Sequence, residues 1–169
     1  MLDDLDRALA PLVGLALTGT ARESNMLSLR FGRGDGDALA PDYTLDVFCA
    51  WRLARDGRIL VGSGDLFTPA DPAEELETFD YDAPGGSWWD ARVAAYFAES
   101  PAPPVVQHVT ADPLGGVRLA LSDGASLDVF PNSSAAEHLE TEFWRITRPG
   151  TGDAQLVVGT FGLDRVPAE

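Results

Sequence analysis

The sequence predicts an α+β fold dominated by antiparallel β-sheet, with a short N-terminal helix and one helix between two similar halves. Apolar and polar residues alternate over several stretches, as they do in strands with one buried face. Three segments also recur in the same order later in the chain: Leu45–Phe48 as Leu127–Phe130, Trp51–Leu53 as Trp144–Ile146, and Ile59–Ser63 as Leu156–Thr160. We therefore expect internally duplicated β-meander units.

The N-terminal helix is predicted by leucines at three- and four-residue steps, from Leu2 to Leu12. Acidic residues in its first turn complement the helix dipole, and Pro11 ends it.

The first half shows a period of two from Leu27 to Phe31 and again from Tyr43 to Leu53. Asp56-Gly57 is a two-residue hairpin signal. With that loop, Leu53 is expected opposite Leu60, and Trp51 opposite Gly62.

The second half repeats this pattern, with alternation from Val117 to Leu121 and a turn at Asp123-Gly124. Setting apolar residues opposite each other requires a three- or five-residue loop there, and the three-residue loop sets Arg118 across from Asp128. The register of the first half, carried over, pairs Ile146 with Val157 and sets Trp144 beside Gly159.

The connector between the halves, 64–104, holds an acidic loop rich in Pro and Gly and then a helix. Ser87 followed by Asp90 resembles a capping box that opens this helix. We expect a single domain, 1–169, with internal repeats at about 27–63 and 117–160 and about nine strands and two helices in all. The sequence does not decide whether the two halves form one sheet or two.

The chain is strongly acidic: 27 acidic against 12 basic residues give a net charge of -15. Such a surface repels phosphate backbones and anionic lipid, so we expect no nucleic-acid or membrane binding and favour a basic protein partner. A single cysteine, Cys49, fits a reducing compartment. With no secretory or membrane-spanning run, we expect a cytoplasmic protein.

Catalytic chemistry would have to start from Cys49, with His108 or His138 to activate it. Cys49 lies on the apolar strand face, however, and is expected to be a buried, inert hydrophobe. His138 has no second ligand at a metal-binding spacing. We therefore expect no metal, no cofactor and no catalytic set, and an enzyme is the least favoured alternative.

A candidate partner site lies between Arg58 and Arg92, where eight acidic residues occur without a basic one. Aromatic residues are interleaved with these acids, and carboxylates beside aromatic faces can bind Arg or Lys. The predicted site residues are Glu74, Glu75, Glu77, Phe79 and Tyr81. A solvated acidic loop without a partner is the other interpretation.

The runner-up function is a small-ligand-binding sheet with its site near the two repeated Trp-Arg pairs, Trp51-Arg52 and Trp144-Arg145. Both arginines could hold a ligand carboxylate. Ion pairing of these arginines with Asp46 or Glu142 is the simpler explanation.

The segments Cys49–Leu53, Val61–Ser63, Val129–Pro131 and Trp144-Arg145, with the N-terminal helix and Leu17–Gly19, resemble a family of small bacterial proteins of unknown function. These proteins are typical of high-GC actinobacteria. The resemblance implies a cytoplasmic single domain and carries no activity, cofactor or catalytic residue. It leaves open that the family neutralises or binds other proteins, such as toxins.

Overall fold

The computed structural model describes residues 2–33, 40–134 and 140–167 and shows the predicted α+β fold, with antiparallel sheets and two α-helices. The helices are α1 (Leu2–Leu9), extended by the 3-10 helix η1 (Ala10–Leu12), and α2 (Trp88–Glu99). A second 3-10 helix is η2 (Ser63–Phe67). The strands are β1 (Leu17–Glu23), β2 (Met26–Phe31), β3 (Tyr43–Val47), β4 (Ala50–Arg55), β5 (Arg58–Gly62), β6 (Val106–Ala111), β7 (Val117–Leu121), β8 (Ser126–Phe130), β9 (Glu142–Thr147), β10 (Gln155–Gly159) and β11 (Gly162–Val166).

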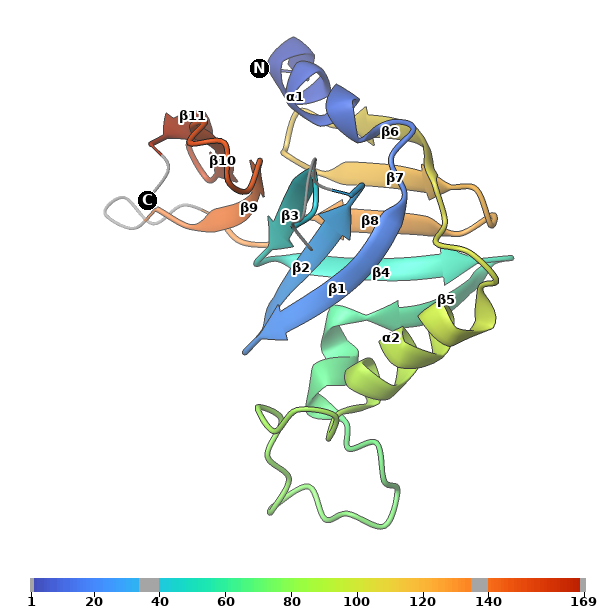
Figure 1. The fold of residues 1–169 in the computed structure, drawn as a ribbon. Coiled ribbons are helices and arrows are strands. Elements are labelled where there is room, and N and C mark those ends of the chain that lie inside the picture. The colour runs from blue at the N-terminus through green and yellow to red at the C-terminus, as the bar shows by residue number, and fades with distance from the viewer. Residues whose placement is uncertain (1, 34–39, 135–139, 168–169) are drawn as a thin grey trace.

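The strands form two sheets, and each half of the chain contributes to both (Figure 1). The six-stranded sheet has the order β1-β2-β3-β9-β10-β11, and the five-stranded sheet has the order β5-β4-β8-β7-β6. Sequence alternation missed two strands. In β1 a bulge beside Gly19 interrupts the period of two, and β11 is a mostly exposed edge strand whose sequence carries little apolar signal.

The chain crosses between the sheets in the middle of the stretch that sequence alternation treats as one strand. Between β3 and β4 it bends at Phe48 and Cys49, and Phe48 N donates to Phe143 O at 2.9 Å. The apolar residues on both sides of the bend still face the interior, because the two sheets pack against one core. The alternation therefore predicted correctly which residues are buried, but it gave no sign that the chain passes from one sheet to the other.

Within each sheet, a strand with an echoed segment from one half pairs with a strand with an echoed segment from the other half. In the six-stranded sheet β3 pairs with β9, so that Leu45 lies opposite Ile146 and Asp46 opposite Arg145. In the five-stranded sheet β8 pairs with β4 in the same register. There Leu127 lies opposite Leu53 and Asp128 opposite Arg52.

Further features of the two halves match as well. The edge hairpins β1–β2 and β6–β7 each carry one register shift at the corresponding place, between Leu17 and Gly19 and between Val106 and His108. An isolated bridge joins Ala16 to Val105, just before these two strands. The first half thus donates three strands to the six-stranded sheet and then two to the five-stranded sheet. The second half donates three strands to the five-stranded sheet and then three, β9 to β11, to the six-stranded sheet. Apart from the extra strand β11, this is the arrangement that internal duplication predicts.

Two predicted registers are wrong by one residue, although each Trp-bearing strand has the expected Gly-bearing strand as its neighbour. A bulge in β5 sets Leu53 opposite Val61 instead of Leu60, and Gly62 lies opposite Arg52. In the second half Ile146 pairs with Leu156 and Trp144 with Val158. Of the two registers expected for β7 and β8, the structure has the one with the three-residue loop, with Arg118 opposite Asp128.

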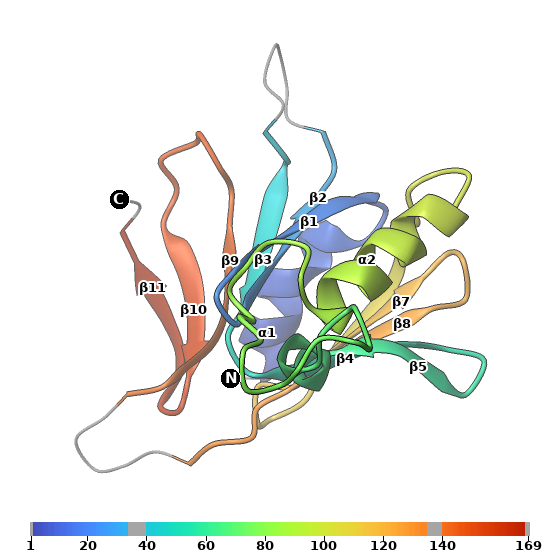
Figure 2. The same cartoon turned by 90° about the horizontal axis from the view of Figure 1, so that it is seen from below.

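The core lies between the two sheets and is closed on two sides by the helices (Figures 1 and 2). The N-terminal helical segment contacts β6, and its buried side carries Leu5, Leu9 and Leu12. Ser87 and Asp90 form the predicted capping box of α2. Trp89 and Tyr96 of α2 are buried, and α2 packs against β5 and η2.

Candidate functional site

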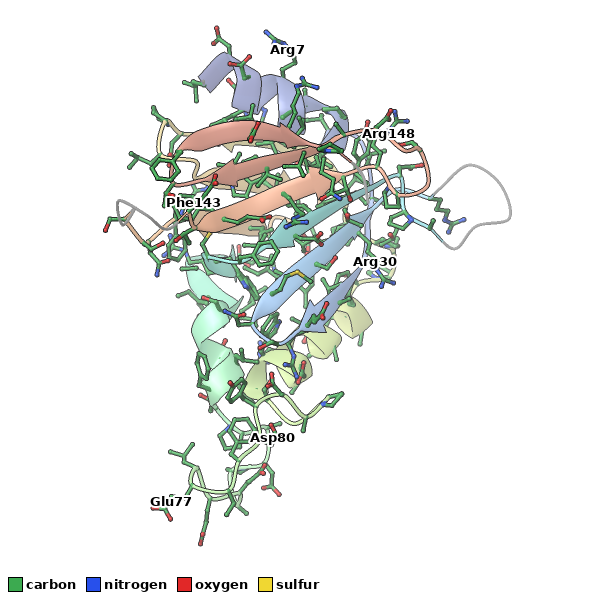
Figure 3. The ribbon with its side chains drawn as sticks, turned by 90° about the vertical axis from the view of Figure 1, so that its left-hand side faces the viewer. Arg7, Arg30, Glu77, Asp80, Phe143 and Arg148 are labelled. Carbon is green, nitrogen blue, oxygen red and sulfur yellow. The ribbon has the colours of Figure 1, made fainter. Side chains whose placement is uncertain are left out.

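The acidic loop, residues 68–87, leaves η2, extends away from both sheets and returns at α2 (Figures 1 and 3). Its two ends are joined by backbone hydrogen bonds. Trp88 N donates to Thr68 O at 2.7 Å, and Ala70 N donates to Gly86 O at 2.8 Å. The loop is therefore a closed surface excursion with a narrow base, which gives its side chains a defined place on the protein.

Aspartates shape the turns of this loop. Asp71 Oδ1 accepts from Ala73 N at 2.8 Å, and Asp80 Oδ1 accepts from Asp82 N at 3.0 Å. These Asx contacts replace the regular hydrogen bonds of a helix or strand. Part of the acidity of the loop thus has a local structural role.

The base of the loop is anchored by Asp90, the third residue of α2. Arg22 of β1 donates from Nε and Nη2 to the Asp90 carboxylate at 3.0 and 3.1 Å, and from Nη2 to Ala83 O at 3.3 Å. Asp90 Oδ2 also accepts from Gly85 N and Ser87 Oγ. Partial burial would raise the pKa of the Asp90 carboxyl, but the hydrogen bonds from Arg22 and Ser87 outweigh it and hold the pKa below its ordinary value.

The predicted glutamates lie on the free part of the loop. Glu74, Glu75 and Glu77 are exposed, and Figure 3 shows Glu77 at the end farthest from the sheets. Among the described residues none of the three takes part in an ion pair. Their charges are therefore available to an incoming cation.

The aromatic part of the predicted site differs in detail from the expectation. Tyr81 is 40% exposed, whereas Phe79 is half-buried. Phe67, at the end of η2, is 58% exposed and packs edge to face on Tyr81 with ring centroids 5.4 Å apart. Leu76 is 71% exposed. Phe67 and Leu76 were not among the predicted site residues, although their position beside the acids was a usable signal.

The two repeated Trp-Arg pairs are not brought together. Trp51 and Trp144 are buried in the core, where Trp144 Nε1 donates to Gly115 O at 2.7 Å. Arg52 and Arg145 belong to different sheets.

Each of these arginines also has a carboxylate partner. Arg145 donates to both oxygens of Glu142 at 2.6 Å, one of the two pairings that the sequence suggested. Arg52 Nε donates to Asp128 Oδ2 at 3.1 Å, and Arg118 donates to the other oxygen. Partial burial would raise the pKa of Asp128, but its bonds with Arg118 and Arg52 hold it below the ordinary value. The carboxylate between the two arginines thus occupies the place that an anionic ligand would need.

The surroundings of the Cys49 thiol make it less acidic than an ordinary cysteine. Cys49 is half-buried rather than fully buried, and burial raises the pKa of its thiol to about 12. His108 is exposed on β6, and no hydrogen bond joins it to Cys49. His138 lies outside the described residues. In the described part of the chain, no three His, Cys, Asp or Glu side chains gather as a metal site requires.

Within the described ranges, no helix combines the length and the apolar character that crossing a membrane requires. Comparisons with known proteins give no relative: no family model, no curated protein sequence and no solved structure matches this chain.

Proposed function

We propose that this is a non-enzymatic, cytoplasmic interaction domain whose acidic loop binds a basic protein, a toxin being one partner of that kind. The proposal rests on two features of this region: the exposed Phe67–Tyr81 pair, and the glutamates farther along the loop, which have no ion-pair partner among the described residues. Carboxylates and aromatic faces together suit Arg and Lys side chains, which can ion-pair with the first and stack on the second.

Two features of the loop would contribute to binding in different ways: its negative charge and its exposed aromatic rings. The six acids at positions 71, 74, 75, 77, 80 and 82 lie in it without one basic residue, so they attract a basic partner over a distance set by salt screening. The exposed rings supply apolar area that binding can remove from water, which is typical of residues that dominate affinity. We therefore expect charge to set the association rate and Phe67 and Tyr81 to set the dissociation rate.

The rigid base favours binding over a merely solvated loop. Arg22 and Asp90 hold the end of the loop against the domain, so less conformational freedom is lost when a partner docks than for an unanchored segment. Arg52 and Arg145 lie in different sheets, and each pairs with a carboxylate, so no specific observation on the described residues favours the small-ligand alternative.

The test is capture of basic proteins from the native lysate by the immobilised protein, with association rates then measured for each captured protein. Replacing Glu74, Glu75 and Glu77 with Gln should slow association about tenfold or more at low salt and leave the fold intact. The matched control replaces three exposed acids elsewhere, Asp3→Asn, Asp6→Asn and Asp56→Asn, which changes net charge equally.

Equal slowing in both triple variants would show that only net charge matters and would refute a site in the loop. Unchanged binding in the Gln variant would refute it as well. Phe67→Ala should raise the dissociation rate while leaving the association rate almost unchanged, because this side chain carries no charge.

A further inference from the structure

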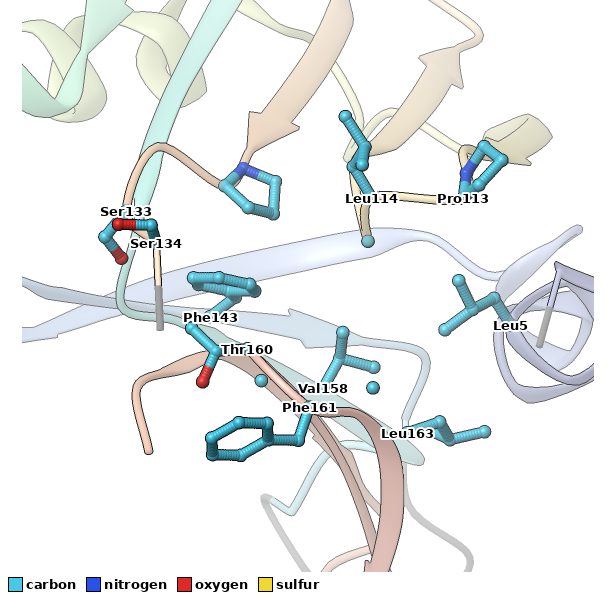
Figure 4. Close-up of a pocket in the computed structure, with 14 residues that line it drawn as sticks. Leu5, Pro113, Leu114, Ser133, Ser134, Phe143, Val158, Thr160, Phe161 and Leu163 are labelled. Carbon is cyan, nitrogen blue, oxygen red and sulfur yellow. The ribbon is translucent and has the colours of Figure 1, made fainter. Parts of the chain in front are cut away.

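A largely apolar pocket of about 400 Å³ lies beside Phe143 (Figure 4). Figure 3 shows Phe143 far from Glu77 at the tip of the acidic loop. Leu5 of α1, Phe143 of β9 and Val158 of β10 line the pocket, and the turn between β6 and β7 closes another side. Its volume is within the range of ~300–1,000 Å³ that is typical of pockets that hold a ligand.

Two large apolar side chains stand exposed at this pocket. Leu114, in the turn between β6 and β7, is 80% exposed, and Phe161, in the turn between β10 and β11, is 67% exposed. Figure 4 shows Phe161 on the same side of the pocket as Phe143 and Val158, and Leu114 on the opposite side. Exposed side chains of this size beside an apolar cavity are typical of an interaction surface.

The first half of the chain covers the corresponding side of the sheets with its own residues. After β5 the chain forms η2, which packs against α2 and places Leu66 in the core that also contains Trp89. After β10 the chain turns sharply into β11 instead, and Phe161 remains outside. The pocket is thus a part of the core surface that the second half leaves open.

The charges around the pocket favour a second copy of this chain as its occupant. The neighbouring groove between α1 and β11 is lined by Asp4, Arg7, Asp164 and Arg165, two acids and two bases. The whole chain carries -15, so most of its surface repels another copy. This balanced region allows two copies to approach, whereas a basic partner is drawn to the acidic loop.

We propose that the protein forms a two-fold symmetric dimer in which Phe161 of each copy enters the apolar pocket of the other. A two-fold interface needs a surface that is complementary to itself, and here the cavity and the protruding side chain lie side by side on one surface. Asp4 and Arg7 already form an ion pair with each other at 3.2 Å within one copy, so they bring no net charge to the interface. Across the two-fold axis, Arg165 of one copy can face Asp164 of the other. The acidic loops remain free at the far ends of the dimer.

The test is sedimentation velocity and light scattering of the full chain over a wide range of concentration. The wild type should reach twice the chain mass, and high salt should weaken this dimer only slightly because its centre is apolar. Phe161→Asp should raise the dissociation constant roughly a hundredfold or more, since a symmetric interface loses the side chain twice. Leu114→Asp should act in the same direction.

The matched control is Ile59→Asp on β5, which changes a side chain that is 63% exposed and distant from the pocket. Circular dichroism checks that all three variants are folded. A photo-crosslinking residue at position 161, in a mixture of isotopically light and heavy chains, should join peptides from two different copies and reach residues 113–115 or 143.

A wild type that stays monomeric at every concentration would overturn the proposal. So would a dimer that resists both pocket variants, or crosslinks from position 161 that reach only other proteins. None of these results depends on the acidic loop, so this proposal and the proposed function can fail separately.

Discussion

Replacing Asp90 with Asn should destabilise the protein by releasing the base of the acidic loop. The side chains of Arg22 and Asp90 keep only 11% and 19% of their surface exposed, so the substitution leaves a largely buried guanidinium without its counter-charge. Breaking a fully buried ion pair costs about 3–5 kcal/mol. Partial exposure and the hydrogen bonds that Asn retains reduce the expected loss to about 2–3 kcal/mol of unfolding free energy.

The assay is urea denaturation, combined with amide hydrogen exchange at Gly85 and Ser87, whose N–H groups donate to Asp90 Oδ2. Both amides should exchange faster in Asp90→Asn. The matched control is Asp153→Asn, which removes the exposed Arg148–Asp153 pair and should cost less than about 1 kcal/mol. Equal losses in the two variants would refute the role given to Asp90.

The pH dependence gives a second check on the same residue. The pKa of Asp90 is lower in the folded than in the unfolded state, so its carboxylate stabilises the fold above its ordinary pKa of about 3.9. This contribution is lost as pH falls below that value through the folded pKa. The difference between wild type and Asp90→Asn should therefore be largest near neutral pH and shrink in acid. A difference that persists in acid would contradict the charge argument.

Trp144→Phe should cost about 1–3 kcal/mol of unfolding free energy, because it leaves the carbonyl of Gly115 without its indole donor. Trp51→Phe should cost less in the same chemical denaturation assay, because the indole N–H of Trp51 has no hydrogen-bond partner among the described residues. Gly159→Ala should destabilise more than Gly62→Ala in the same assay, because an added Cβ would lie 2.8 Å from Thr141 O in the first case and 3.3 Å from Trp51 O in the second. Cys49 should react far more slowly with a thiol reagent at pH 7 in the native than in the denatured protein, since burial raises its pKa to about 12.

The surroundings of Gly62 differ from those that the sequence predicts. A register with Gly62 opposite Trp51 suggested that a larger side chain would meet the indole. Because the bulge in β5 moves Gly62 opposite Arg52, the closest atom to an added Cβ is instead the carbonyl oxygen of Trp51. Gly159 lies opposite Glu142, against the backbone at Thr141.

The sequence by itself determined which residues face the core and where the chain turns, because both follow from short-range physics. Alternation at Leu45 and Leu127 reflects the two-residue period of a strand, and Ser87 with Asp90 caps a helix through contacts three residues apart. The net charge and the acidic loop are likewise properties of composition.

Only the tertiary structure decided which strands pair across the halves. A chain that alternates from Tyr43 to Leu53 buries the same residues in one sheet or two, so periodicity could not show the crossing at Phe48 and Cys49. The register of β5 on β4 depended on a bulge, and that of β10 on β9 was off by one residue before its own bulge; alternation of apolar residues shows neither. The candidate site, too, could be predicted from the sequence only in part. Its free carboxylates could be read from composition, whereas the pairing of Phe67 with Tyr81 and the anchoring of the loop by Arg22 required long-range contacts.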